Sequence, residues 1–170
     1  MVEESEYIPT IHNEIQNRVN YALSRHAKVM VVRYDLHFPA DKAYSGHGEY
    51  IRSFQNKLRQ NLRRRKLDPV DLWVREQNIS LNPHYHCFLL LDGNKVQSIY
   101  AVLPLAERLW ASTIGDDRNG LVQRCRKNWD GSKSINGCRL TRIDQGLYYQ
   151  CQDWLSYLAK EYTKGNAPPH

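Results

Sequence analysis

The order of apolar and polar residues along the chain shows two different periods. In four segments apolar residues recur every three or four positions, which places them on one face of a helix. In five other segments they alternate with polar residues or form short apolar runs, as in the strands of a sheet. The pattern predicts helices over residues 10–27, 49–66, 96–113 and 147–164, and strands over residues 29–38, 70–77, 84–91, 121–128 and 135–143.

This order of elements predicts an α+β fold. Strands joined by short connections and interspersed with helices favour a five-stranded, mostly antiparallel sheet with helices packed on it. The length of 170 residues suits one domain with a core of its own. We therefore expect a single domain over residues 1–170, with a core over about 28–164 and an N-terminal helix over about 10–27.

Three local signals refine this prediction. Thr10 can cap the N-terminus of the first helix, because its hydroxyl oxygen can accept a hydrogen bond from a free backbone N–H. Pro104 either kinks the third predicted helix or opens a fresh one, because proline fits a first helical turn. Asp130 and Gly131 favour a turn between the last two strands, which predicts a late hairpin.

The composition narrows the classes of protein that fit the chain. Its 24 Lys and Arg residues outnumber its 18 Asp and Glu residues, and this positive charge fits a polyanionic partner such as a nucleic acid. Clean apolar runs such as Cys87–Leu91 are far shorter than the roughly 20 residues of a membrane-spanning helix. The N-terminus is acidic and polar, unlike a secretory signal, and the four cysteines form no CxxC pair. We therefore expect a cytoplasmic protein with no membrane partner.

Two histidines stand two positions apart in a strongly apolar predicted strand, within the run NPHYHCFLLL. Because side chains alternate across a strand, His84 and His86 share one face and lie about 6–7 Å apart. Neutral imidazoles at this spacing can bind one divalent metal ion. The alternative is a pair of ordinary surface or core histidines, although two half-buried histidines on one face are uncommon without a role.

A carboxylate in the preceding strand is a candidate third ligand. If the two strands form a hairpin, Glu76 lies beside His84 or His86, since its even offset from both is compatible with one face of the sheet. Two histidines and one carboxylate would leave coordination positions open for a substrate. The alternative for Glu76 is a solvent-facing strand carboxylate. Asp35 and His37, on the polar face of the first strand, either help to position this group or are ordinary strand residues.

The last predicted helix carries a tyrosine beside lysines. A helical wheel at about 100° per residue gives a buried stripe of Cys151, Trp154, Leu155, Leu158 and Tyr162. Tyr157 falls at the edge of this stripe, with Lys160 and Lys164 beside it. Cations there can stabilise a phenolate and hold a phosphate. The alternative is a boundary tyrosine among solvated lysines.

Together these segments resemble the HUH single-strand endonucleases, a superfamily of rolling-circle replication initiators, relaxases and some transposases. The resemblance rests on the histidine pair, the upstream carboxylate and the downstream Tyr-x-x-Lys, in the runs WVREQ, NPHYHCFLLLDG and WLSYLAKEYTK. It is closest to replication initiators of the filamentous-phage (inovirus) type, with a YagK/YfjJ-like domain, whose first motif resembles the strand VMVVRYDLHFP. It covers about residues 28–164.

This resemblance implies a metal-dependent, site-specific single-strand DNA endonuclease that initiates rolling-circle replication of phage or mobile DNA. Glu76, His84 and His86 would then hold Mg²⁺ or Mn²⁺. Tyr157 would be the nucleophile that nicks and rejoins DNA through a 5′-phosphotyrosine, and Lys160 would contact the phosphate. We expect a one-tyrosine mechanism, and Tyr148 and Tyr149 are the alternatives. The implied partners are single-stranded DNA at a replication origin and a host helicase and polymerase, in the cytoplasm of a bacterial host cell.

Further basic residues form candidate contacts to DNA. They comprise Arg59, Arg63, Arg64, Arg65 and Lys66 at the end of the second predicted helix, Arg124, Arg126, Arg139 and Arg142 on the late hairpin, and Lys164. Such clusters are typical of phosphate contacts, which weaken as the salt concentration rises. For the helical group, a favourable interaction with the dipole of its own helix is an equal alternative.

Other functions fit parts of the pattern. A relaxase or transposase would use the same chemistry, and a non-catalytic nucleic-acid-binding domain would carry the histidines as vestiges. A cupin is disfavoured, because Leu90 and Leu91 stand where a cupin carries a carboxylate after its histidines. A two-histidine phosphoesterase needs a second His-x-Thr/Ser motif, which the sequence lacks.

Overall fold

The computed structural model describes residues 2–77, 79–124, 137 and 139–162, without the side chains of residues 2–11, 154 and 156–162. Its elements are α1 (Val2–Arg25), β1 (Lys28–Leu36), α2 (His47–Arg64), β2 (Val70–Glu76), β3 (His84–Asp92), the 3₁₀ helix η1 (Ile99–Ala101), α3 (Leu103–Ile114), β4 (Val122–Arg124), β5 (Arg139–Thr141) and α4 (Gln145–Tyr162). The predicted α+β class and five-stranded, mostly antiparallel sheet are confirmed.

β3 and β1 form the centre of the sheet. The strands run in the order β2-β3-β1-β4, and β5 also pairs with β1. The described pairings are antiparallel, and the longest, between β1 and β3, begins with Val29 opposite Asp92. β2 and β3 form the predicted hairpin, in which Glu76 lies opposite His84. The pairings of β3 with its two neighbours therefore fix which side chains meet on each face.

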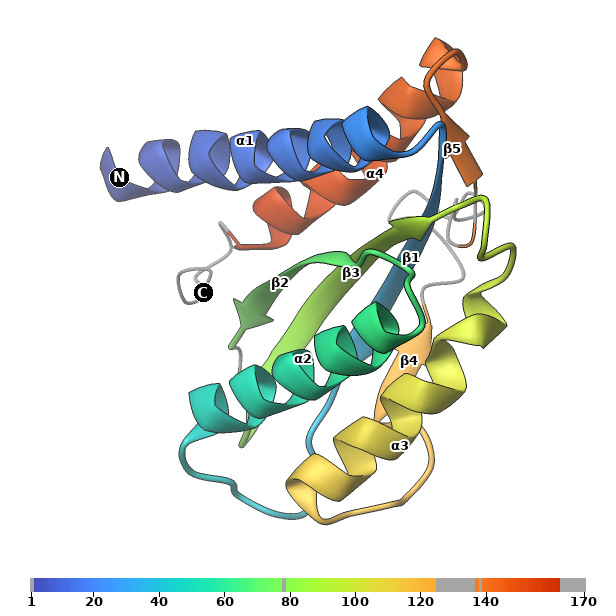
Figure 1. Ribbon diagram of the computed structural model, residues 1–170. Coiled ribbons are helices and arrows are strands. Elements are labelled where there is room, and N and C mark those ends of the chain that lie inside the picture. Colours follow the sequence, from blue (N-terminus) through green and yellow to red (C-terminus); the bar gives the residue numbers. More distant parts are fainter. Residues whose placement is uncertain (1, 78, 125–136, 138, 163–170) are drawn as a thin grey trace.

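α2 and α3 cover one face of the sheet (Figure 1). Tyr34 of β1 and Tyr85 of β3 point into this layer, where they pack with Phe54 of α2 and Trp110 of α3. All four side chains are fully buried. The rings of Phe54 and Trp110 meet edge to face with their centroids 5.5 Å apart. Burial of this apolar and aromatic surface is the main force that holds the two helices on the sheet.

α1 and α4 lie side by side over the opposite face (Figure 1). Ile15 and Val19 of α1 and Cys151 and Leu155 of α4 pack with Phe88 of β3, and all five are fully buried. Because side chains alternate along a strand, the residues of β3 at even steps from Phe88 point to this same α1–α4 face.

The helix ends differ in part from the prediction. α1 begins at Val2 rather than at Thr10, so the prediction of Thr10 as an N-cap was wrong. Pro104 lies in the first turn of α3, so it opens a fresh helix rather than kinking a longer one.

The predicted late hairpin was wrong for the described residues. β4 pairs with β1 at Tyr34–Leu36, whereas β5 pairs with β1 at Lys28–Met30. Because β3 occupies the other edge of β1, the two short strands follow one another along a single edge. The predicted turn at Asp130 and Gly131 lies outside the described residues.

Within the described residues, no helix combines the length and the apolar character that a membrane crossing requires. Cys87 and Cys151 are buried on opposite faces of the sheet. The other two cysteines, Cys125 and Cys138, lie outside the described residues.

Gly93 marks a close approach between the end of β3 and the start of β1. Its N–H donates to the carbonyl oxygen of Lys28 at 2.8 Å, and a Cβ at this position would lie 2.7 Å from the backbone carbon of Lys28. Gly93→Ala should therefore lower the free energy of unfolding by about 1–3 kcal/mol, because backbone has to move to admit the methyl group. Urea unfolding measures this change.

Gly146→Ala is the matched control. Gly146 lies in the first turn of α4, and a Cβ there would meet no atom closer than 3.7 Å. Its stability should stay equal or rise slightly, because alanine favours the helix. Equal stability of the Gly93→Ala variant and the unmodified protein would contradict the close approach.

Candidate metal centre

Three strands bring polar side chains together at one end of the sheet. His84 and His86 lie at even steps from Phe88 along β3, so they point to the α1–α4 face. Glu76 of β2 lies directly opposite His84, and Asp35 of β1 lies directly opposite His86. The register of two strand pairs therefore positions this group on regular secondary structure.

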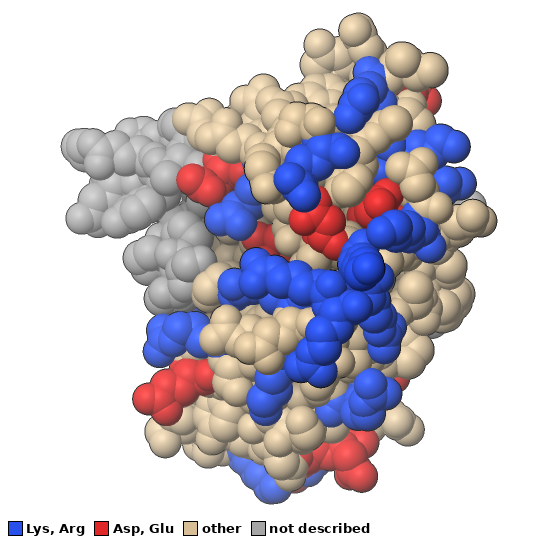
Figure 2. All heavy atoms as spheres, viewed as in Figure 1, with Lys and Arg blue, Asp and Glu red and all other residues tan. Residues whose placement is uncertain are grey.

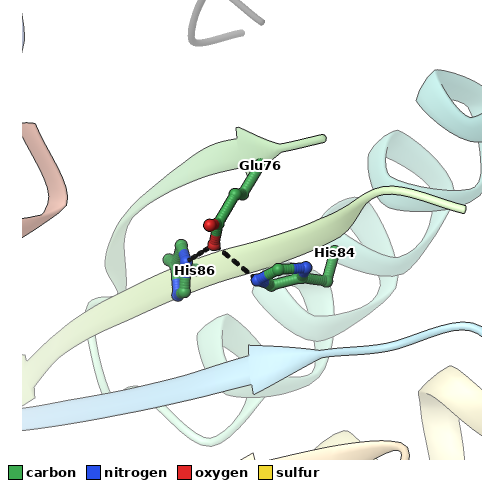
Figure 3. Close-up of side chains that lie close together, drawn as sticks. All are labelled: Glu76, His84 and His86. Carbon is green, nitrogen blue, oxygen red and sulfur yellow. Dashed lines mark hydrogen bonds and ion pairs between the residues drawn. The ribbon is translucent and has the colours of Figure 1, made fainter. Parts of the chain in front are cut away.

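Glu76 contacts both imidazoles (Figure 3). Its Oε2 atom lies 2.5 Å from Nε2 of His84 and 2.6 Å from Nε2 of His86. One ligand atom from each residue lies within 4.8 Å of the other two, a spacing at which the three could hold one metal ion. His86 is 7% exposed, and Glu76 and His84 are partly buried. The structure thus brings together the three residues that the sequence singled out as ligands.

A second carboxylate lies behind His86. The Nδ1–H of His86 donates to Oδ1 of Asp35 at 2.9 Å, while Nε2 faces Glu76. Histidines that bind metals commonly have a carboxylate on the far ring nitrogen, because it fixes the tautomer and the orientation of the ring. Asp35 therefore has the geometry of a positioning residue, which favours the first of the two roles considered for it.

The charges of this group depend on one another. Hydrogen bonds with His84 and His86 hold the pKa of Glu76 well below its usual range. Burial alone would lower the pKa of His86, but hydrogen bonds with Asp35 and Glu76 outweigh it and raise this pKa to about 9. Burial alone would raise the pKa of Asp35, but His86 outweighs it and lowers this pKa. The carboxylates of Glu76 and Asp35 therefore stay ionised, and their negative charge favours a cation at this group.

His37 extends the group beyond the end of β1. Its ring stacks on that of His84, with centroids 5.0 Å apart and planes inclined by 14°. Burial lowers the pKa of His37, which favours the neutral ring at physiological pH. Its Nε2 atom is buried and has no hydrogen-bond partner among the described residues. Buried polar atoms are usually paired, so this nitrogen is a place where a ligand atom could bind.

Asn82 holds the loop that precedes His84. Its side chain is 7% exposed, and its Nδ2 donates to the carbonyl oxygens of Pro39 and Lys42. Its Oδ1 accepts a hydrogen bond from the backbone N–H of Tyr44. These bonds tie the β2–β3 loop to the segment after β1. The sequence marked Asn82 only as a loop residue, because its partners are about 40 positions away and have no local signature.

The predicted nucleophile and its lysine belong to α4. Tyr157 and Lys160 lie within this helix, but their side chains are outside the part that the structure describes. Cys151 and Leu155, predicted for the buried stripe, are fully buried. Through this stripe α4 packs on the face of the sheet that carries the three candidate ligands.

The basic cluster of α2 lies on the other face of the sheet. α2 packs against the core opposite α1 and α4, and Figure 2 shows Lys and Arg side chains gathered over this side of the molecule. Arg59 forms an ion pair with Asp71 at 3.4 Å, whereas residues 63–66 are exposed. The cluster and the candidate ligands therefore do not share one face.

The arginines predicted as DNA contacts on the late hairpin have different roles in the structure. Arg139 donates to the carbonyl oxygen of Gly93, and Arg142 donates to two carbonyl groups near the end of α1, so both support the fold. Arg124 donates to the hydroxyl of Tyr100 and lies over its ring. The predicted DNA contacts outside the described residues are Arg126 and Lys164.

The donor set fits a divalent metal ion. Two imidazole nitrogens and one carboxylate oxygen suit Mn²⁺ better than Mg²⁺, which prefers oxygen ligands. Three ligands from the protein would leave positions open for substrate oxygens, as in catalytic sites. The ionised carboxylates favour the charge of such an ion.

Replacement of both histidines should abolish metal binding. Loss of an outer partner alone lowers metal affinity about 10–100-fold, so the His84→Ala, His86→Ala double variant should bind Mn²⁺ at least about 100-fold more weakly. Isothermal titration calorimetry measures the affinity. His12→Ala on the exposed side of α1 is the control and should bind as the unmodified protein does. Unchanged affinity of the double variant would exclude this site.

Mn²⁺ should also stabilise the fold. A ligand at 100 times its dissociation constant adds about 2.7 kcal/mol to the free energy of unfolding, so the melting temperature should rise and fall back on addition of EDTA. Glu76→Gln should lose this rise, because it removes the carboxylate that faces both imidazoles. Glu107→Gln, exposed on α3, is the control. An equal Mn²⁺ effect in both variants would contradict a role for Glu76.

Comparison with known proteins gives one match. The model of the YagK/YfjJ C-terminal domain family matches residues 2–169, a range that includes the three candidate ligands and all of α4. No curated protein and no solved structure matches the chain.

Proposed function

The chain belongs to the YagK/YfjJ C-terminal domain family, and from its His-His-Glu group we propose that it is a metal-dependent, site-specific single-strand DNA endonuclease. It nicks and rejoins DNA through a 5′-phosphotyrosine and so initiates rolling-circle replication of phage or other mobile DNA. The convergence of Glu76, His84 and His86 on one face of the sheet is the observation that carries this proposal.

The three ligands have the chemistry that phosphoryl transfer needs. When bound, Mg²⁺ or Mn²⁺ supplies a Lewis acid that withdraws charge from a phosphate oxygen. Glu76, His84 and His86 would hold the ion on regular strands, and the hydrogen bond from His86 to Asp35 fixes the ring of His86.

Tyr157 is the proposed nucleophile. Its phenol loses a proton to solvent, its oxygen attacks the scissile phosphorus, and the bond from phosphorus to the 3′ oxygen breaks. The 3′ oxygen takes up a proton and leaves as a hydroxyl, while the 5′ phosphate stays on Tyr157. Attack by a 3′ hydroxyl reverses the step, because the phosphodiester energy is retained. Lys160, one turn further along α4, holds the phosphate, and the packing of α4 on the ligand-bearing face supports both roles.

The charge of the molecule supports a DNA substrate. The chain carries an excess of Lys and Arg, and residues 63–66 of the α2 cluster are exposed to solvent. Such charges bind phosphates without reading sequence. The free 3′ hydroxyl would prime a host polymerase, with a host helicase unwinding the duplex ahead of it in the cytoplasm of the bacterium.

Two other functions use the same features. A relaxase or transposase would perform the same strand transfer for a different process. A non-catalytic nucleic-acid-binding module would use the basic surface alone and would form no covalent adduct. The adduct therefore separates an enzyme from a binding module.

Tyr157→Phe should abolish the covalent adduct and leave DNA binding within about twofold, because it removes only the attacking oxygen. Circular single-stranded DNA carrying candidate origins is incubated with Mn²⁺, and a denaturing gel records the protein–DNA adduct. Filter binding in EDTA records affinity.

Tyr149→Phe is the matched control. Tyr149 belongs to the same helix and is 64% exposed, so its substitution should leave both folding and the adduct unchanged. An adduct that persists in Tyr157→Phe would show that the nucleophile is wrongly assigned, and its loss in Tyr149→Phe would point to Tyr149 instead. Absence of any adduct with the unmodified protein across the origin set would favour the binding module.

A further inference from the structure

A pocket of about 480 Å³ adjoins the candidate metal centre. It lies between the β2–β3 loop and the segment that follows β1, and its lining includes His37, Phe38, Ile79, Leu81 and His84. His84, which belongs to the candidate metal-binding group (Figure 3), also lines this pocket. The pocket and the candidate metal centre therefore share the side chain of His84.

The loop side of the pocket exposes two apolar side chains. Ile79 is fully exposed and Leu81 is 63% exposed, although both belong to a loop of only a few residues. Exposed large apolar residues beside a pocket often mark a binding surface, because their burial by a ligand is favourable. His37 and His84 also line the pocket, and the outer faces of their stacked rings are of the kind on which bases stack.

The pocket is preformed. The side chain of Asn82, which lines it, bonds to the backbone of residues 39, 42 and 44 and so fixes the base of the loop. Phe38 is 6% exposed and packs on Tyr44 with ring centroids 4.9 Å apart. A ligand would therefore meet walls that are already in place, which lowers the entropic cost of binding.

We propose that this pocket holds one nucleobase of single-stranded DNA, next to the phosphate at the metal centre. The proposal rests on the proposed function for the position of that phosphate. The base contacts the apolar loop residues Ile79 and Leu81 and the imidazole rings of His37 and His84, all of which line the pocket. Because apolar contact and stacking dominate, every base can bind, and the pocket serves to position the strand more than to read its sequence.

Binding of two oligonucleotides tests the proposal. The probes are single-stranded dT12 and a 12-residue abasic strand with the same phosphates, each measured by fluorescence anisotropy in Mn²⁺. The unmodified protein should prefer dT12 by about tenfold, as expected when a base stacks. The Ile79→Ser, Leu81→Ser double variant should lose most of this preference while binding the abasic strand equally well. Because both side chains are exposed, the variant is expected to fold normally.

Ile143→Ser is the matched control. Ile143 is 91% exposed but follows β5, which pairs with the opposite end of β1, so its substitution should keep the preference for dT12. Equal binding of the two probes by the unmodified protein, or a loop variant that keeps the preference, would overturn the pocket assignment. So would light scattering that shows the loop residues holding two copies of the chain together.

The same samples separate this proposal from the proposed function. An adduct gel with origin DNA reports catalysis, whereas the ratio of the two affinities reports the base pocket. If the protein forms no adduct but prefers dT12 in a way that depends on the loop residues, the base pocket is supported and the proposed nuclease activity is contradicted. If the protein forms the adduct but shows no preference for dT12, the nuclease activity is supported and the base pocket is contradicted.

Discussion

The register of β3 between β2 and β1 is the constraint on which the candidate site depends. It places Glu76 opposite His84 and Asp35 opposite His86, so that two cross-strand pairs make one cluster. A shift of the register by one residue would turn both histidines into the layer of α2 and α3 and separate them from the carboxylates. The buried apolar residues that follow on the same strand, such as Phe88, prevent such a shift, because they have to stay in the core.

The cluster is also an electrostatic unit. The carboxylates of Asp35 and Glu76 lie on either side of the ring of His86. Their hydrogen bonds stabilise the protonated ring and raise the pKa of His86 to about 9. A buried group of this kind is stable only when its charges are paired. A divalent ion between Glu76, His84 and His86 would take over the role of the proton, so metal binding and deprotonation of His86 are linked.

The candidate metal ligands and the basic cluster of α2 lie on opposite faces of the sheet. The candidate ligands and the helix with Tyr157 lie on the α1–α4 face, and the exposed basic residues of α2 lie on the other (Figures 1 and 2). A single strand of DNA that contacted both the candidate ligands and the basic residues of α2 would have to pass around an edge or an end of the sheet. The β2–β3 loop lies at the end of the sheet that carries the candidate ligands, and its apolar residues Ile79 and Leu81 are exposed there.

The sequence by itself determined the periodic elements and which three residues are candidate ligands. Alternation along single strands put His84 and His86 on one face, and an even offset across a hairpin added Glu76, since both rules depend only on neighbours in the chain. The tertiary structure decided the features that depend on residues far apart in the sequence. The pairing of β4 and β5 with opposite ends of β1 escaped prediction, because strands of three residues carry too little periodicity to show their partner. The loop bonds of Asn82 and the placement of the α2 cluster away from the ligands were likewise decided by packing, which brings together residues that local sequence patterns cannot relate.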